Sequence, residues 1–201
     1  MNRINNPCTA LSFLVAAALA IAGCNSGAPA AEPPLAGAAI GGDFTLTASD
    51  GRTVKWDDFA GKYRVVYFGY AFCPDICPTD MQRVAQGLKV LSANDPEKAA
   101  RIQPIFITID PERDTPKVVG EFAAAFSPDI IGLTGTPEQI AAAAKTFKVF
   151  YAKGDPVEGG GYLVDHSNIV YLFGPEGEPL ATLPVDQGGD AVAAELGKWV
   201  N

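Results

Sequence analysis

The sequence predicts an α/β fold for a single domain of residues 43–201. Two observations lead to this prediction. Short runs of apolar, β-branched and aromatic residues alternate along the chain with segments whose apolar residues recur at the 3.6-residue period of a helix. The alternation then ends in a hairpin pattern followed by one last helical segment.

The domain begins with a small hairpin. Residues 44–46 and 53–55 flank Asp50 and Gly51, a dipeptide typical of tight turns. The run from Tyr63 to Tyr70 follows, and it is apolar after Arg64, as expected of a central strand that is buried on both faces. The hairpin therefore precedes the alternating part of the fold as an N-terminal extension.

Three helical segments follow, and each begins at a proline, a residue favoured in the first helical turn. These prolines are Pro78, Pro116 and Pro137. The third helix also carries a capping-box pattern, Thr136 with Gln139 three residues later. Apolar residues line one face of each helix: Met81, Val84, Ala85, Leu88 and Leu91; Val118, Val119, Phe122 and Phe126; Ile140, Ala143, Ala144 and Phe147.

Two further strands, a second hairpin and a final helix complete the predicted elements. The strands are residues 104–109 and 130–133, and the hairpin joins 168–173 to 179–183. The final helix presents Val192, Leu196, Trp199 and Val200 on one face. This order is typical of a thioredoxin-like fold, in which functional loops lie at the carboxyl ends of parallel strands.

Composition narrows the possible partners. The 201 residues include 15 Lys and Arg against 23 Asp and Glu, which gives a formal net charge of -8. With no basic run anywhere, the chain lacks the surface that neutralises phosphates, and this excludes nucleic acid as a partner. The sequence contains one histidine, His166, so a single chain cannot build a site from two imidazoles.

Residues 1–23 are predicted to be a lipoprotein signal peptide. The apolar run from Leu11 to Ala22 would span about 18 Å as a helix, short of the roughly 30 Å of hydrocarbon in a bilayer. The ending Ile21-Ala22-Gly23-Cys24 resembles the lipobox of bacterial lipoproteins, which implies lipidation at Cys24. An ordinary cleaved signal with an incidental cysteine is the alternative.

Residues 24–42 are expected to form the lipidated cysteine and a flexible tether. They are Ala, Gly, Pro and Ser for the most part, with Glu32 as the one charged residue. The signal and the tether together predict an exported bacterial lipoprotein. Its domain would lie on the periplasmic or outer face of the membrane that holds the lipid.

Cys73 and Cys77 lie at the end of a predicted strand and the start of a helix. The positive end of the helix dipole stabilises a thiolate, so we expect a lowered pKa for Cys77. A structural disulfide that closes a small loop is the alternative. His166 could complete a metal site, because in a thioredoxin-type fold the loop entering the last hairpin lies beside the cysteines. For an isolated histidine, a position on the surface or in the core is the competing interpretation.

Four segments in this order and spacing resemble the Sco/SenC family of copper-binding, thioredoxin-like proteins. They are Cys73-Pro-Asp-Ile-Cys77-Pro, Asp110-Pro-Glu-Arg-Asp-Thr-Pro116, residues 131–137, and Tyr162-Leu-Val-Asp-His166-Ser. The resemblance covers roughly residues 38–198. It implies copper ligands at Cys73, Cys77 and His166, and a metallochaperone that delivers copper to the binuclear site of cytochrome c oxidase subunit II. Many relatives carry a transmembrane helix where this chain has Cys24.

The ligand chemistry agrees with copper on its own terms. Thiolates hold Cu(I), an imidazole suits Cu(II), and a set of two cysteines and one histidine can retain either ion. Zinc could use the same three ligands with a water. Asp75 and Asp165 are not expected to bind the metal, and at most they would contact the residues that do. If residues 165 and 166 are extended, their side chains point to opposite faces, so Asp165 would not orient His166 directly.

A disulfide between Cys73 and Cys77 could not hold copper as two thiolates do. Loading therefore requires a thiol-disulfide reductase partner, and transfer requires an acceptor protein. The alternative function is an enzyme, a thiol-disulfide reductase that acts on the cysteines of the oxidase's copper site. It would use Cys73 and Cys77 as its redox pair, although three residues separate them instead of the usual two. A peroxiredoxin-type peroxidase is the least favoured function. Such enzymes usually have Thr or Ser three residues before the reactive cysteine, and here that position, three residues before Cys73, is Tyr70. For residues 110–116, a partner-contacting loop and a rigid turn with a helix cap both stay open.

Overall fold

The computed structural model describes residues 31–157 and 160–201. The folded unit spans Glu32–Asn201. The predicted signal peptide and Cys24 lie outside the described residues. No helix in the described part of the chain is long and apolar enough to cross a lipid bilayer.

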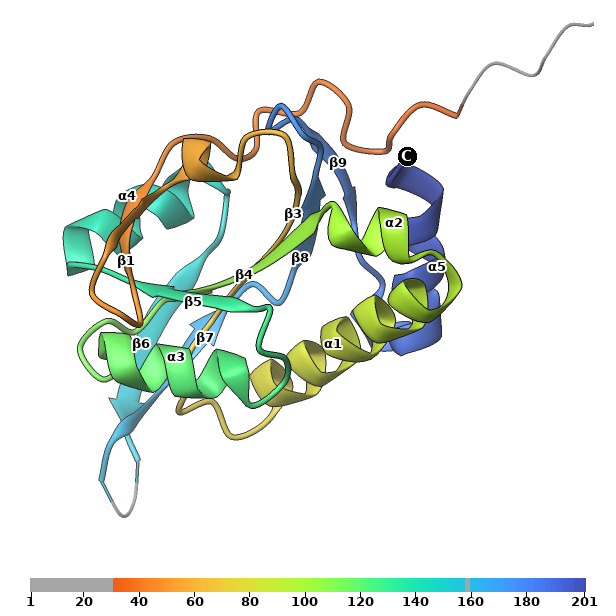
Figure 1. Cartoon of the computed structure of the whole chain (residues 1–201). Helices are drawn as coiled ribbons and strands as arrows, with labels where there is room; N and C mark the ends of the chain where they lie inside the picture. The colour runs from red at the N-terminus through yellow and green to blue at the C-terminus, as the bar shows by residue number, and fades with distance from the viewer. Residues whose placement is uncertain (1–30, 158–159) are drawn as a thin grey trace, which may run out of the picture. The chain divides into compact units, whose positions relative to one another are not determined.

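The centre of the fold is a seven-stranded sheet in the order β2-β1-β5-β4-β3-β8-β9 (Figure 1). The strands are β1 Thr45–Ala48, β2 Thr53–Lys55, β3 Tyr63–Gly69, β4 Ile102–Thr108, β5 Ile131–Thr134, β8 Val170–Phe173 and β9 Pro179–Thr182. β4 is parallel to both β3 and β5, and antiparallel hairpins flank this parallel part on either side. Both hairpins predicted from the sequence are confirmed.

The parallel strands form the core of the sheet. Every residue of β3 is buried, and so are all but one of β4, because helices and loops cover both faces. Arg64 is the charged exception within β3, and its guanidinium lies 4.3 Å from the centroid of the Trp56 ring. The uninterrupted apolar runs of the sequence correspond to these doubly covered strands.

Within residues 31–157 and 160–201, five α-helices surround the sheet: α1 Ile76–Asn94, α2 Pro96–Ala100, α3 Pro116–Ala124, α4 Pro137–Thr146 and α5 Gly189–Trp199. Short 3-10 helices, η1 Trp56–Phe59 and η2 Val185–Gln187, lie between strands and helices. The capping box that starts α4 is confirmed, since the Gln139 N–H donates to Thr136 Oγ1 and Gln139 Oε1 accepts from the Thr136 N–H. α1 begins at Ile76 and not at the expected Pro78.

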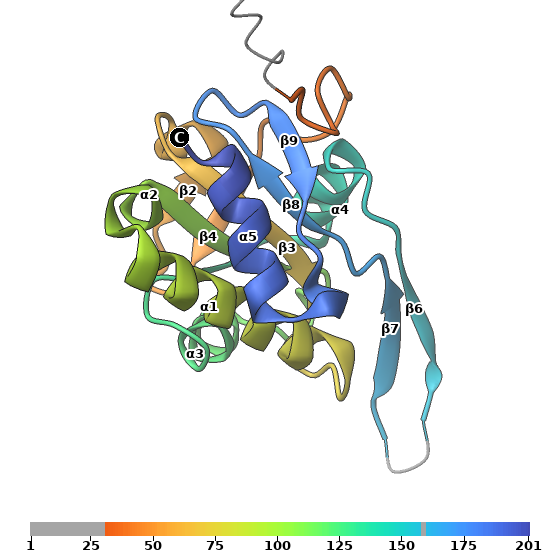
Figure 2. The same ribbon diagram turned by 90° about the vertical axis from the view of Figure 1, so that its right-hand side faces the viewer.

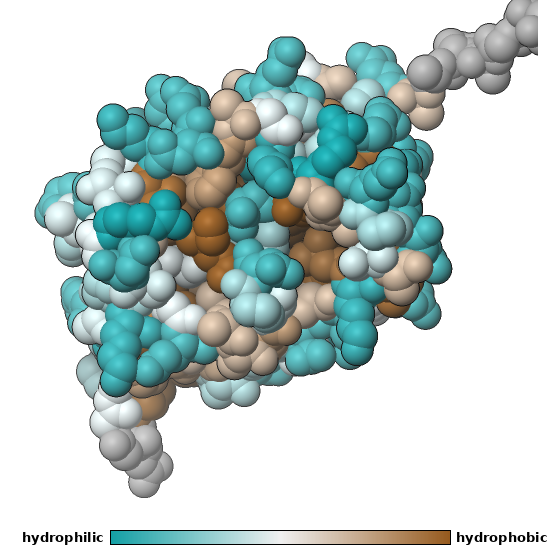
Figure 3. Space-filling model, in the orientation of Figure 1, coloured by the Kyte–Doolittle hydropathy of each residue, from teal (hydrophilic) through white to brown (hydrophobic). Residues whose placement is uncertain are grey.

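α1 and α5 lie side by side (Figure 2). Gly87 makes this close approach possible, because a Cβ at that position would come within 2.4 Å of Val192 Cγ1. The face shown in Figure 3 has hydrophilic side chains around hollows in which apolar side chains are visible. The alternating elements, with a flanking hairpin at the N-terminal end, form the α/β fold expected from the sequence.

A second, two-stranded sheet consists of β6 (Tyr151–Pro156) and β7 (Tyr162–His166). Figure 2 shows this hairpin beside the main sheet, extending away from the helices. It is not among the elements expected from the sequence. Gly154 and Pro156 interrupt the strand pattern of β6, so the local signal for a strand is weak.

The described part of the expected tether differs from the prediction. Leu35 and Ile40 pack against the hydrophobic core. The Leu35 N–H donates to the Leu180 carbonyl at 3.0 Å, and the Gly41 N–H donates to the Thr146 carbonyl at 3.2 Å. These two apolar side chains, within a segment rich in Ala, Gly and Pro, hold it against the domain.

Candidate metal centre

The two cysteines lie where the main sheet meets α1. The chain leaves β3 at Gly69, turns through residues 70–75 and enters α1 at Ile76. Cys73 is half-buried in this turn, and Cys77 is fully buried in the first turn of the helix. Both thiols are free, and the backbone N–H of Cys77 lies 3.5 Å from Cys73 Sγ.

His166 approaches the cysteines from the other sheet. It is the last residue of β7, and its Nε2 lies 3.2 Å from Cys77 Sγ. Its Nδ1 lies 2.9 Å from the Ser167 carbonyl oxygen, which can only accept a hydrogen bond. Nδ1 therefore carries the proton, and the lone pair of Nε2 points toward the thiols.

The structure brings Cys73, Cys77 and His166 together. Their ligand atoms, two Sγ and one nitrogen, all lie within 4.8 Å of one another. Two sulfur ligands at about 2.3 Å from one ion can be at most about 4.6 Å apart, so a small shift would let all three atoms contact a single metal. Two thiolates and an imidazole are the donor set that suits copper in either oxidation state.

Burial controls the protonation of Cys77. Desolvation raises the pKa of the Cys77 thiol well above its usual range, and the neighbouring Cys73 side chain raises it further. The expectation of a lowered pKa is wrong, because the side chain is fully buried and desolvation outweighs the helix N-terminus. Cys77 is a neutral thiol at neutral pH, and a metal that binds there displaces its proton.

Burial also favours the ligating form of His166. Desolvation lowers the pKa of the imidazole, an effect partly opposed by its contact with the Ser167 carbonyl and by the charge of Asp80. The ring is therefore neutral at neutral pH, as metal binding requires.

Two further residues next to the ligands are missing from the sequence prediction. The Tyr67 hydroxyl donates to Asp80 Oδ2 at 3.2 Å, and the Tyr67 ring is 6.2 Å from the His166 ring in an edge-on arrangement. Asp80 is buried on α1, three residues after Cys77, and that helical spacing is a signal that could have identified it. Asp75 and Asp165 are exposed, and Asp165 points away from His166 as the extended backbone predicted.

The comparisons with known proteins agree with this geometry. A family model described as SCO1/SenC matches residues 32–201. The chain belongs to the SCO1/SenC family. It is 46% identical over 144 residues to "Protein SenC" of Rhodobacter capsulatus, a match that covers 70% of this chain and 62% of that protein.

Other members of the SCO1/SenC family show the same relationship. "Protein SCO1 homolog 1, mitochondrial" of Arabidopsis thaliana is 43% identical over 146 residues, which cover 72% of this chain but 42% of the relative. This chain therefore spans less than two thirds of the length of either relative.

Solved structures of the family share the fold. The crystal structure of Arabidopsis thaliana ScoI with copper bound has 37% sequence identity and a TM-score of 0.74, covering 80% of this chain and 98% of that one. The copper-bound structure of yeast Sco1 has 35% identity and a TM-score of 0.73, covering 81% and 88% of the two chains. The thioredoxin-like fold predicted for this SCO1/SenC chain is confirmed.

Proposed function

We propose that this chain binds one copper ion through Cys73 Sγ, Cys77 Sγ and His166 Nε2 and transfers it to the binuclear copper site of cytochrome c oxidase subunit II. The observation that carries the proposal is the convergence of these three ligand atoms within 4.8 Å. Membership of a family that includes copper-bound structures supports copper over zinc as the metal.

The donor set explains how one site can hold both oxidation states. The two thiolates favour the soft Cu(I) ion, and the imidazole nitrogen adds a donor suited to Cu(II). Two thiolate charges balance those of Cu(II) and leave a net charge of -1 with Cu(I). Cys73 and His166 are partly exposed whereas Cys77 is fully buried, so an acceptor would reach the ion from the side of Cys73 and His166.

Apolar surface near the site supports docking to another protein. Six large hydrophobic side chains are exposed in the described residues, and all of them lie in residues 72–76 or 150–169, the two regions that carry the proposed ligands. They are Phe72, Ile76, Phe150, Val157, Leu163 and Ile169. Of these six side chains, Phe72 and Ile76 lie in the turn and the first helical residues that carry the cysteines, and exposed apolar side chains beside a site are typical of a surface that contacts a partner.

The redox state of the cysteines decides whether copper can bind. Forming the Cys73–Cys77 disulfide removes two electrons and two protons from the thiols and leaves no thiolate for the metal. A thiol-disulfide reductase upstream would return these electrons. The alternative function, a reductase that uses Cys73 and Cys77 as its own redox pair, is less well supported, because burial raises the pKa of Cys77 and reduces the fraction of reactive thiolate.

The N-terminal anchor is part of the same proposal. Cleavage after residue 23 and lipidation of Cys24 would hold the domain at the outer side of a membrane. The support is the sequence pattern of residues 11–24.

Copper titration of the reduced, full-length chain under anaerobic conditions tests the proposed binding. We expect one copper per chain, loss of binding when Cys73 and Cys77 are both replaced by Ser, and no binding by the disulfide form. Equal copper uptake by the oxidised chain or by the double variant would place the site elsewhere. Dithiol reductase activity that exceeds that of a small dithiol, without copper uptake, would support the enzyme instead.

A further inference from the structure

The proposed ligands belong to two different sheets. The cysteines follow β3 of the main sheet, whereas His166 ends β7 of the separate hairpin. Among the described residues, no strand pairing joins the two sheets. Tyr151 and His166 pair at the same end of the hairpin, so the hairpin is attached to the domain at that end. Other contacts must therefore set its tilt toward the cysteines.

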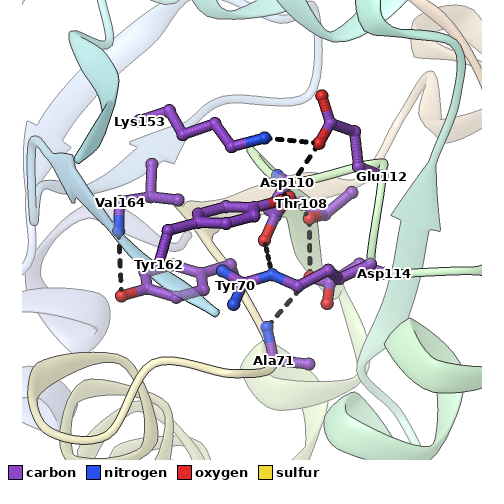
Figure 4. A network of polar contacts seen from close by, with 10 residues as sticks. Tyr70, Ala71, Thr108, Asp110, Glu112, Asp114, Lys153, Tyr162 and Val164 are labelled. Atoms are coloured by element: carbon purple, nitrogen blue, oxygen red, sulfur yellow. Dashed lines mark hydrogen bonds and ion pairs between the residues drawn. The ribbon is translucent and has the colours of Figure 1, made fainter. Parts of the chain in front are cut away.

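Residues 110–114, which follow β4, contact the cysteine loop, residues 70–77, through Asp114. Asp114 is fully buried, and its Oδ2 accepts from the Ala71 N–H at 2.9 Å and from the Thr108 hydroxyl at 2.6 Å (Figure 4). Ala71 is two residues before Cys73. The Asp114 carbonyl accepts from the Thr134 hydroxyl at 2.8 Å, which fixes this segment to β5. Asp114 thus connects the cysteine loop to β4 through its carboxylate, and its backbone carbonyl connects the same residue to β5.

The same segment reaches the histidine hairpin through Asp110. The Tyr162 hydroxyl, at the far end of β7 from His166, donates to Asp110 Oδ1 at 2.7 Å (Figure 4). The other oxygen of Asp110 forms an ion pair with Arg113. The Arg113 guanidinium in turn lies 3.7 Å from the centroid of the Tyr162 ring. Asp110 is almost fully buried, so it holds Tyr162 and is closed to a partner protein.

Two more contacts hold the hairpin in the same orientation. The Val164 N–H donates to the Tyr70 hydroxyl at 3.2 Å, which connects β7 directly to the residue after β3. Lys153 of β6 forms a 2.6 Å ion pair with Glu112 (Figure 4). Residues 110–114 therefore contact both the loop that carries the cysteines and the hairpin that carries His166.

We propose that Asp110 and Asp114 are positioning residues of the copper site, Asp114 for the cysteine loop and Asp110, through Tyr162, for His166. This inference rests on the proposed function. If the hairpin tilts, His166 moves away from the ion while the cysteines stay in place. The two thiolates still hold Cu(I), whereas Cu(II) loses its nitrogen donor. The Asp110 contact thus affects Cu(II) selectively, and the Asp114 contact affects both ions.

Tyr162→Phe tests the histidine side, because it removes one hydroxyl and keeps the ring against Arg113. We expect about a tenfold loss of Cu(II) affinity, the lower end of what changes behind metal ligands usually cost. The Cu(II) electron paramagnetic resonance spectrum should shift toward that of His166→Ala, while Cu(I) affinity stays at the wild-type value. Tyr151→Phe is the matched control: it removes a tyrosine hydroxyl from the same hairpin, opposite His166 in the register, and leaves the Asp110 contact in place.

Asp114→Ala and Asp114→Asn test the cysteine side in the reduced, metal-free full chain. Asp114→Ala removes the acceptor for the Ala71 N–H, so the hydrogen exchange of that amide should accelerate at least tenfold. Asp114→Asn keeps a side-chain oxygen and should restore slow exchange. Asp114→Ala should also weaken the binding of Cu(I) and Cu(II) together.

Several results would overturn the inference. They are a wild-type Cu(II) spectrum and affinity for Tyr162→Phe, equal effects of Tyr162→Phe and Tyr151→Phe, or unchanged Ala71 exchange in Asp114→Ala. Equal losses of Cu(I) and Cu(II) binding in Tyr162→Phe would also contradict it, since they would indicate general loosening of the fold. If the wild-type chain takes up no copper, the proposed function fails, but the metal-free exchange experiment still decides the role of Asp114.

Discussion

His166 has its two ring nitrogens committed to different tasks. Nδ1 is held by the Ser167 carbonyl at 2.9 Å, and Nε2 lies 3.2 Å from Cys77 Sγ. The contact through Nδ1 fixes both the tautomer and the ring direction, as it does for most histidines that bind metals. In many metal sites a carboxylate orients the histidine ring. Here the neighbouring carboxylate, Asp165, is exposed, and the Ser167 carbonyl orients His166 instead.

Replacing His166 by Ala should weaken Cu(II) binding more than Cu(I) binding. Two thiolates can hold Cu(I) nearly linearly, whereas Cu(II) loses its only imidazole donor. We expect at least a tenfold larger loss of affinity for Cu(II), measured by competition with chelators in each oxidation state. Formation of the Cys73–Cys77 disulfide should survive, because dithiol exchange needs no imidazole.

The opposite pattern would favour the enzyme. If His166→Ala leaves copper affinity and oxidase assembly unchanged while dithiol reductase activity collapses, the chaperone proposal is wrong. Copper affinity and reductase activity must be measured on the same preparations, because only the two results together distinguish a role of His166 as a ligand from a role in redox chemistry.

At the scale of elements, close packing of α1 against α5 depends on a missing side chain. A Cβ at Gly87 would come within 2.4 Å of Val192 Cγ1 and 3.0 Å of the Gly189 carbonyl oxygen. We expect Gly87→Ala to lower the free energy of unfolding by about 1–3 kcal/mol, because overpacking exceeds the gain in helix propensity. Urea denaturation measures this change.

Gly197 of α5 provides the matched control. A Cβ there would have an ordinary contact, 3.9 Å from Leu91 Cδ1. Gly197→Ala should therefore stabilise the fold by up to about 1 kcal/mol through helix propensity alone. A destabilised Gly197→Ala, or a neutral Gly87→Ala, would contradict the packing argument.

Elements with strong local signals were predictable from the sequence. The strand at Tyr63, the hairpin around Asp50 and the capping box at Thr136 all depend on residues close together in the chain. The β6–β7 hairpin was not predictable in this way. It is held by contacts such as Tyr162 with Asp110, which join residues far apart in sequence.

The candidate site shows the same division. Spacing and residue type were enough to nominate Cys73, Cys77 and His166, which the fold brings together. The protonation state of Cys77 could not be predicted from the sequence. Its position near a helix N-terminus suggests a lowered pKa, whereas its complete burial raises the pKa. Burial is a property of the assembled core, and so it appears only in the structure.

At the scale of the whole molecule, the proposed anchor can be tested separately from the copper site. We expect the mature protein to begin at Cys24 with lipid on its sulfur, because the apolar run before it is too short to span a bilayer. Intact-mass measurement of protein extracted from membranes checks this. A mature chain that keeps residues 1–23, or an unmodified Cys24, would contradict the prediction.

Transfer to an acceptor should depend on the exposed apolar side chains beside the cysteines. Ile76 is the better residue to change, because Phe72 lies 5.2 Å from the Arg113 guanidinium and its loss could also disturb the positioning of the site. We expect Ile76→Ser to keep wild-type copper affinity, since its side chain provides no ligand. Copper transfer to the soluble domain of oxidase subunit II should slow about fivefold, equivalent to the loss of about 1 kcal/mol of contact.

Leu163→Ser is the control for this experiment. Leu163 is similarly exposed, but it alternates with His166 on β7 and points to the opposite face of the hairpin. Its replacement should leave the transfer rate at the wild-type value. If both variants slow transfer equally, general surface hydrophobicity drives docking. If neither variant slows transfer, the acceptor does not cover the start of α1. The proposed approach of the acceptor beside Cys73 would then be wrong, and an approach along the β6–β7 hairpin would replace it.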